Sequence, residues 1–198
     1  YGAGPKETLD LFLPAGPVRG TYAFFHGGYW RARDKSDVAF VAAPFIAHGI
    51  AVASVNYDLC PEVSIADIVD ECRRAVAWIA REGTRHGADA SRLVIGGHSA
   101  GGHLVTMLAT RSNEDTRVQA VVGFAPVTDH EQDLAQRGGL SVALQNLLNL
   151  PKEVTPAALA QLRALSPINR VRAGMPPVLL IHGLDDTRQP HGHLRPLS

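Results

Sequence analysis

One short stretch constrains the fold of this chain more than any other: residues 92–103, which read RLVIGGHSAGGH. The apolar run 93–95 is typical of a buried strand, and Gly97–Gly101 fits the pattern G-x-S-x-G. In that pattern a serine stands clear of the end of a sheet, and the flanking glycines remove side chains that would clash in the turn. The stretch therefore predicts an α/β protein in which Ser99 is an exposed nucleophile.

The rest of the chain alternates between strand and helix patterns. Apolar residues are spaced as in strands over 8–13, 21–25, 50–55, 118–124 and 178–181, and as in helices over 38–48, from 64 onward, 104–110, 140–150 and 156–165. Because strands alternate with helices, we expect a mostly parallel central sheet with helices on both faces and residues 8–13 at or near an edge.

Local signals mark three helix ends. Ser64 with Asp67 three residues later forms a capping box, and Thr155-Pro156 supplies an N-cap followed by proline at the first helical position. Gly49 is a fitting C-cap for the helix that precedes it. The long segment between the last two predicted strands is expected to act partly as a crossover and partly as a lid.

Composition limits the class of partner. Lys and Arg together number 19, as do Asp and Glu, and the pI is near 7.3. This balance gives no electrostatic reason to expect nucleic acid or an anionic membrane, so we expect a small neutral or amphipathic ligand. No apolar run reaches the ~18 residues of a membrane span.

The cysteines and the first residue bear on the compartment. Cys60 and Cys72 stand in no metal-binding or redox spacing, which predicts two buried thiols, with a disulfide between them as the weaker alternative. The chain begins with Tyr1 rather than Met. This suggests a processed or partial sequence, in which the absence of a targeting signal proves little. A cytoplasmic location is therefore only a default expectation.

A glycine pair follows the second predicted strand and offers backbone N–H groups as hydrogen-bond donors. In His26-Gly27-Gly28 the glycines let backbone N–H groups approach a carbonyl oxygen without obstruction. Acyl transfer to a serine needs such donors for its oxyanion, each worth ~3 to 4 kcal/mol in the transition state. Gly27 and Gly28, with the amide of Ala100 at a helix N-terminus, are the predicted donors. His26 is expected to brace this loop by hydrogen bonds rather than to react.

Three further side chains are candidates for the substrate pocket. Tyr29 and Trp30 follow the glycine pair and suit an acyl or aromatic pocket, although core packing under the loop fits them equally well. His98 precedes Ser99, where it either borders the pocket or packs in the turn.

The pairing of HGGYW with GHSAGG resembles the α/β-hydrolase superfamily. Within it, the chain is similar to esterases and to arylformamidases (kynurenine formamidase-like enzymes) that carry an H-G-G-x-W loop. The resemblance covers residues 8–190, including the Asn56-Tyr57 turn. It implies a serine–histidine–acid triad, no cofactor, and cleavage of a carboxylic ester through an acyl-enzyme. An alternative substrate is an aryl formamide such as N-formylkynurenine.

The resemblance also suggests the acidic residue of the triad. The loop HGLDDTRQP looks like the family's H-G-x-x-D-x-x-x-P loop, which assigns the carboxylate to Asp186. Asp185 and Asp129 are the alternatives. The carboxylate would fix the histidine tautomer and stabilise the imidazolium.

The catalytic histidine is harder to place. In this superfamily it follows one further helix and strand, whereas only twelve residues follow Asp186, too few for both. We therefore expect one domain over 1–198 without the C-terminal strand and helix, with 126–170 as cap or crossover insertion and 190–198 as an irregular tail. His193, or alternatively His191, is the nearest candidate base.

Further expectations follow from this ending. A missing strand would expose a sheet edge and favour a homodimer through it. His191 and His193 with Asp185 and Asp186 give only a weak metal-binding pattern, and we expect no metal. The rival class of function is a non-catalytic α/β-hydrolase-like binding protein or an inactive truncated fragment.

Overall fold

The computed structural model describes residues 1–111, 118–137, 139, 144–145, 148, 150 and 153–186. Over these ranges the strands are β1 (Leu9–Phe12), β2 (Gly20–Phe25), β3 (Ile50–Val55), β4 (Leu93–His98), β5 (Val118–Phe124) and β6 (Val178–Ile181). The α-helices are α1 (Ala42–Ile46), α2 (Ile65–Glu82), α3 (Ala100–Arg111), α4 (His130–Arg137) and α6 (Pro156–Ala164). The 3₁₀-helices are η1 (Lys35–Val41), η2 (Gly83–His86), η3 (Ala90–Arg92) and η4 (Pro167–Arg170).

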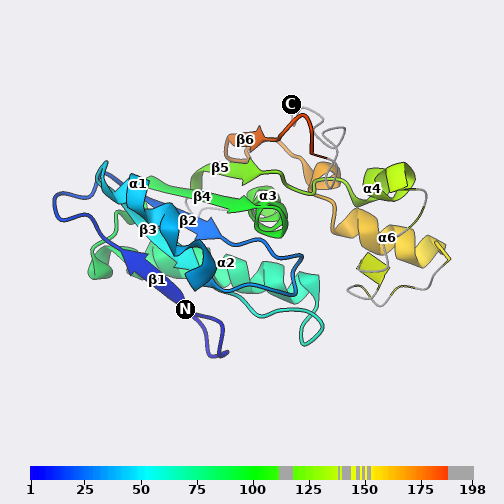
Figure 1. The fold of residues 1–198 in the computed structure, drawn as a ribbon, viewed down its shortest axis with the longest axis horizontal. Coiled ribbons are helices and arrows are strands. Elements are labelled where there is room, and N and C mark those ends of the chain that lie inside the picture. The colour runs from blue at the N-terminus through cyan, green and yellow to red at the C-terminus, as the bar shows by residue number, and fades with distance from the viewer. Residues whose placement is uncertain are drawn as a thin grey trace.

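The strands form one sheet in the order β1-β3-β2-β4-β5-β6 (Figure 1). Only β1 runs antiparallel to its neighbour, and the other four pairings in the described sheet are parallel. The mostly parallel sheet and the edge position of β1 are thus confirmed. Strand β6 is outermost on the other side, with Leu179 and Ile181 exposed. The homodimer through a sheet edge stays a prediction.

Alternation along the strands fills two separate cores. Ala23 and Phe25 of β2 point into the larger core, which lies under α2 and α3. Tyr22 and Phe24 point to the opposite face, where η1 and α1 cover them and the ring of Phe45 stacks on that of Tyr22 with centroids 4.5 Å apart. Helices therefore pack on both faces, as the sequence predicts, and the sheet is buried between them (Figure 1).

The two helix starts with capping signals lie where they were predicted. The Ser64 hydroxyl accepts from the Asp67 amide at 3.2 Å and the Asp67 carboxylate accepts from the Ser64 amide at 3.0 Å, which completes the capping box of α2. The Thr155 hydroxyl accepts from the Ala158 amide at 3.2 Å at the start of α6. These caps formed as expected because each depends only on residues three positions apart.

The helix predicted over 38–48 has a different type and start. It begins as the 3₁₀-helix η1 because the Asp34 carboxylate caps an earlier turn by accepting from the Ser36 amide at 3.1 Å. It continues as α1 only to Ile46, and Gly49 then adopts a left-handed φ of +79° in the turn before β3. The apolar spacing correctly predicted a helix in this segment, but the Asp34 cap makes the helix begin earlier than the spacing indicates.

Helix α4 was not predicted. Its sequence is polar, so it lacks the apolar spacing that marks a buried helix. The Asp129 carboxylate starts it by accepting from the amides of Glu131 and Gln132, both at 3.0 Å. The helix predicted over 140–150 lies mostly outside the described residues.

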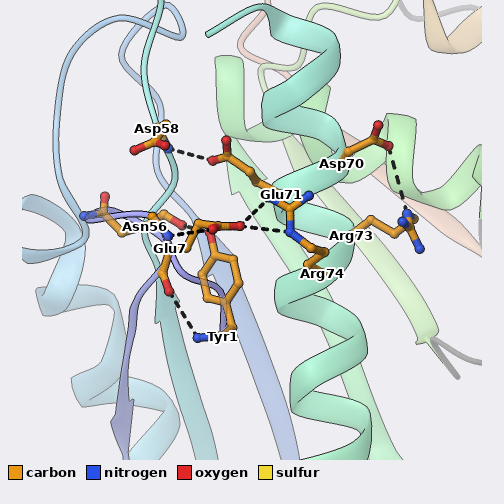
Figure 2. Close-up of polar contacts among 9 residues, drawn as sticks. Tyr1, Glu7, Asn56, Asp58, Asp70, Glu71, Arg73 and Arg74 are labelled. Carbon is orange, nitrogen blue, oxygen red and sulfur yellow. Dashed lines mark hydrogen bonds and ion pairs between the residues drawn. The ribbon is translucent and has the colours of Figure 1, made fainter. Parts of the chain in front are cut away.

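The loop that follows β3 is held by hydrogen bonds from both sides (Figure 2). The Tyr1 hydroxyl donates to the Asn56 carbonyl at 2.6 Å, and the N-terminal ammonium of Tyr1 donates to the Glu7 carbonyl at 3.1 Å. On the other side the Asp58 amide donates to the Glu71 carboxylate of α2 at 2.8 Å. The N-terminal segment and α2 thus fix the end of β3.

The two cysteines are both buried free thiols, as predicted. Burial raises the pKa of Cys60 to about 11 and that of Cys72 well above its usual value, so both thiols are unreactive at neutral pH. None of the helices that the structure describes combines the length and apolar composition needed to cross a membrane.

Candidate active site

The parallel strands bring the predicted site segments to one edge of the sheet. Strand β2 leads into residues 26–30, β4 leads into Ser99, and β6 leads into residues 182–186. Strand β2 pairs with β4, β4 with β5 and β5 with β6. The Ser99 amide donates to the Phe124 carbonyl at 2.8 Å, which fixes the turn to the end of β5. This is the edge at which ligands bind in open α/β sheets.

Ser99 occupies a sharp turn that only small neighbours allow. Its φ is +55°, in the left-handed region, and α3 begins at the next residue, Ala100. A Cβ on Gly97 would lie 2.4 Å from the backbone of Gly101, and a Cβ on Gly101 would lie 2.1 Å from the Phe25 carbonyl oxygen. The two glycines of the motif are therefore required by the close approach of β2, β4 and α3.

The glycine pair after β2 lies against this turn. A Cβ on Gly27 would lie 2.8 Å from the His98 carbonyl oxygen, 3.1 Å from its Nδ1 and 3.4 Å from the Cβ of Ser99. The exposed His98 side chain thus lies beside Gly27. Gly28 has a φ of +117°, which favours glycine. The loop and the serine turn predicted to cooperate therefore pack closely together, with room for a glycine only.

The two residues that follow the glycine pair also adopt left-handed backbone conformations. Tyr29 and Trp30 have φ values of +59° and +58°, and each such residue stores about 1–3 kcal/mol of strain. Trp30 is held in place because its side chain is buried in the core and its carbonyl accepts from the Cys60 amide at 2.8 Å. Tyr29 is 39% exposed. Trp30 thus takes the core position, and Tyr29 borders solvent.

His26 is buried beneath the loop that it braces. Its Nδ1 lies 2.7 Å from the Gly27 carbonyl oxygen and its Nε2 lies 3.2 Å from the Asn56 side-chain oxygen. The ring stacks on that of Tyr57, with centroids 4.2 Å apart and planes within 10°. Burial lowers the pKa of His26. The predicted bracing role is confirmed by these contacts.

The acidic candidates differ in their surroundings. Asp186 follows β6, and one of its carboxylate oxygens lies 3.6 Å from Nε2 of His182, whose side chain is buried. Asp185 beside it is exposed. Asp129 already caps α4 with its carboxylate, as described above. Asp186 therefore stays the preferred acid.

The two histidine candidates, His191 and His193, lie outside the described residues, as does the irregular tail of which they are part. Within the part of the chain that the structure describes, no three His, Cys, Asp or Glu side chains gather as a metal site would require.

A buried histidine behind the site was missed by the sequence reasoning. His103 lies one turn after Ser99 on α3, and its Nε2–H donates to the Leu165 carbonyl at 2.8 Å, beyond the end of α6. Its ring meets that of Trp30 edge-on at 5.0 Å and that of His130 at 5.3 Å. It thus links α3 to the helical insertion. The signal in the sequence was a lone histidine in an otherwise apolar helix, which does not reveal a partner 62 residues away.

His103 should make stability depend on pH. Complete burial lowers its pKa from 6.5 to about 4, so the folded protein keeps it neutral while the unfolded chain protonates it below 6.5. Stability is therefore lost as pH falls from 6.5 to 4, by about 3 kcal/mol. His103→Gln keeps a donor for Leu165 but does not titrate. Urea unfolding at both pH values should show a correspondingly smaller loss in the variant, and equal losses would contradict this assignment.

Comparisons with known proteins agree with this geometry. The family model BD-FAE matches residues 9–197. The chain is 33% identical over 110 residues to a kynurenine formamidase of Salmo salar, covering 54% of this chain and 36% of that protein. It is 29% identical over 177 residues to the probable carboxylic ester hydrolase LipM of Mycobacterium tuberculosis, covering 83% and 40%. A putative thioesterase structure from Silicibacter superimposes with a TM-score of 0.75 at 31% identity, covering 96% and 66%.

The chain spans half or less of the length of the curated relatives it matches. The family model nevertheless covers nearly all of its residues, and the sheet order, the serine turn and the adjoining glycine loop all lie within the matched range. The resemblance inferred from the two motifs is thereby confirmed. The chain belongs to the BD-FAE family, in the esterase and arylformamidase group of the α/β-hydrolase superfamily.

Proposed function

We propose that this chain is a serine hydrolase that cleaves a carboxylic ester through an acyl-enzyme. The observation that supports the proposal is the close packing of Gly27 against the left-handed Ser99 turn at the open edge of the sheet, where a Cβ on Gly27 would lie 3.4 Å from the Cβ of Ser99. A hydroxyl and an oxyanion site so arranged suit attack on a carbonyl carbon.

In the proposed reaction the Ser99 oxygen attacks the ester carbonyl and forms a tetrahedral oxyanion. The N–H groups of Gly27, Gly28 and Ala100 stabilise that oxyanion. A histidine takes the serine proton and returns it to the leaving alcohol, and Asp186 orients that histidine. The same histidine then takes a proton from water as the water oxygen attacks the acyl carbonyl, and it returns that proton to the Ser99 oxygen as the carboxylic acid leaves. His193 and His191 are the proposed bases.

A second candidate is hydrolysis of an aryl formamide. It is favoured by the 33% identity to a kynurenine formamidase, which is higher than the identity to the carboxylic ester hydrolase. The chemistry is shared, because a formamide also passes through a tetrahedral oxyanion. Tyr29 and His98 at the rim of the loop are the proposed contacts for the acyl or aryl group.

The proposal is tested by following p-nitrophenyl acetate hydrolysis and by labelling with a fluorophosphonate, with mass spectrometry of the labelled peptide. We expect hydrolysis and one label, on Ser99. Comparing kcat/KM for short acyl esters with that for N-formylkynurenine decides between the two substrates. Absence of both labelling and hydrolysis would contradict a hydrolase and leave the non-catalytic binding protein or inactive fragment.

A further inference from the structure

The candidate oxyanion donors have carbonyl groups behind them that accept hydrogen bonds. The N–H of Gly27 belongs to the same peptide unit as the carbonyl of His26, and the N–H of Gly28 shares a peptide unit with the carbonyl of Gly27. When a peptide carbonyl accepts a hydrogen bond, the unit becomes more polarised and its N–H becomes a stronger donor.

Both of these carbonyls accept from buried side chains. The Tyr57 hydroxyl donates to the His26 carbonyl at 2.6 Å, and Nδ1 of His26 lies 2.7 Å from the Gly27 carbonyl. Tyr57 and His26 are both fully buried and stack on each other, so neither donor is exposed to water. Two consecutive peptide units thus each receive a short hydrogen bond from a buried side chain.

The direction of each bond is fixed by the groups involved. Burial raises the pKa of Tyr57 well above its usual value, so its hydroxyl keeps its hydrogen. A carbonyl can only accept, so the contact with Gly27 requires a hydrogen on Nδ1 of His26. A neutral ring has one N–H and cannot also donate from Nε2 to the Asn56 oxygen, so the shorter contact, 2.7 Å against 3.2 Å, assigns the hydrogen to Nδ1.

The far side of His26 is fixed as well. The Asn56 side-chain amide donates to the Asp34 carboxylate at 2.7 Å, which turns its oxygen toward Nε2 of His26. Asp34 caps η1 and Asn56 directly follows β3, so both are held by regular structure. With its hydrogen on Nδ1 the neutral ring donates nothing to the Asn56 oxygen, so the stack on Tyr57 and the 2.7 Å contact with the Gly27 carbonyl are what hold Nδ1 in place.

We propose that Tyr57 and His26 are positioning residues that polarise the Gly27 and Gly28 peptide units and so strengthen their N–H groups toward the oxyanion. The inference rests on the proposed function, because it assumes that Ser99 is acylated and that these N–H groups face the oxyanion. It assigns a role in turnover to the segment after β3, which contains neither the nucleophile nor an oxyanion donor. A purely structural role would instead affect only folding.

The test is Tyr57→Phe, which keeps the ring and its stacking but removes the hydroxyl. We expect kcat per active site to fall about three- to tenfold while KM changes less than twofold, because the oxyanion forms only in the transition state. Affinity for a trifluoromethyl ketone, which forms an oxyanion on the serine, should fall by the same factor. Tyr22→Phe is the matched control, since Tyr22 is buried on the opposite face of the sheet, and it should leave kcat unchanged.

A pair of His26 variants tests the second bond. The amide nitrogen of Asn sits near the position of Nδ1 and that of Gln near the position of Nε2, so His26→Asn should retain more of kcat than His26→Gln. Active sites are counted by fluorophosphonate labelling, so a variant that folds poorly loses labelled sites without losing kcat per site. Unchanged kcat per site and unchanged ketone affinity in Tyr57→Phe and His26→Gln would overturn the inference.

The outcome for the wild-type chain separates this inference from the proposed function. If Ser99 of the wild-type chain is labelled and the variants behave like it, only the polarising role is wrong. If the wild-type chain is neither labelled nor active, the proposed function is wrong and the inference that rests on it fails with it.

Discussion

Replacing Ser99 by alanine should lower kcat for p-nitrophenyl acetate by about 10⁴- to 10⁶-fold and abolish fluorophosphonate labelling. In the proposed mechanism the Ser99 hydroxyl oxygen forms the acyl-enzyme, and alanine at this position would leave only the proposed oxyanion donors to assist water. Initial rates at high enzyme concentration and intact-mass spectrometry measure the effect. Labelling that persists at the wild-type rate in the variant would show that another residue is the nucleophile.

Ser99→Gly is the matched control for this prediction. It removes the same hydroxyl, so it should be as inactive as Ser99→Ala. Because Ser99 has a φ of +55°, however, glycine relieves backbone strain that alanine retains. Urea unfolding should find the glycine variant about 0.5–1 kcal/mol more stable than the alanine variant. Equal stabilities would argue that the left-handed turn is relaxed in solution.

The largest loss of stability should follow Gly101→Ala. The new Cβ would lie 2.1 Å from the Phe25 carbonyl oxygen and 2.5 Å from that of His26, which are backbone atoms of a central strand and its loop. Neither can move without breaking the pairing of β2, so we expect a loss of about 3 kcal/mol or more in the free energy of unfolding. Helix α3 would also be pushed from the loop, so kcat should fall in the fraction that remains folded.

Gly16→Ala provides the comparison for urea unfolding. A Cβ at Gly16 meets nothing within 4 Å, and its stability should change by less than about 0.5 kcal/mol. If Gly101→Ala proved as stable as Gly16→Ala, the close approach of α3 to β2 would be wrong. Neither glycine has a positive φ, and helix propensity by itself favours alanine at Gly101, so a loss of stability there must come from packing.

The sequence predicted those parts of the fold that depend on neighbouring residues. Each strand of the sheet came from a short apolar run, and the Ser64–Asp67 capping box marked the start of α2 correctly. Helix α4 was not predicted because its apolar spacing is weak. Its start depends instead on the Asp129 carboxylate, which accepts from the first amides of the helix. The order of the strands could not be predicted from these patterns, since pairing depends on contacts across the whole chain.

The site was predicted to a similar degree. Ser99 and Gly27 came from short motifs, and the structure brings them into contact. His26 was predicted to brace the glycine loop, but its partners were not, because Asn56 and Tyr57 are 30 and 31 residues from His26 in the sequence and meet it only through the parallel pairing of β2 with β3. The motifs identify the candidate nucleophile and oxyanion donors, but not the distant residues that support them.

The position of β2 between β3 and β4 has a consequence for protein design. The glycine loop has the serine turn on one side and the Asn56-Tyr57 turn on the other, so its shape is set by three segments that are far apart in the sequence. Grafting residues 26–30 and the serine turn onto another scaffold would transfer the donors without the groups that hold them. A transplant that is to retain the turnover of the parent should therefore carry all three segments as one unit.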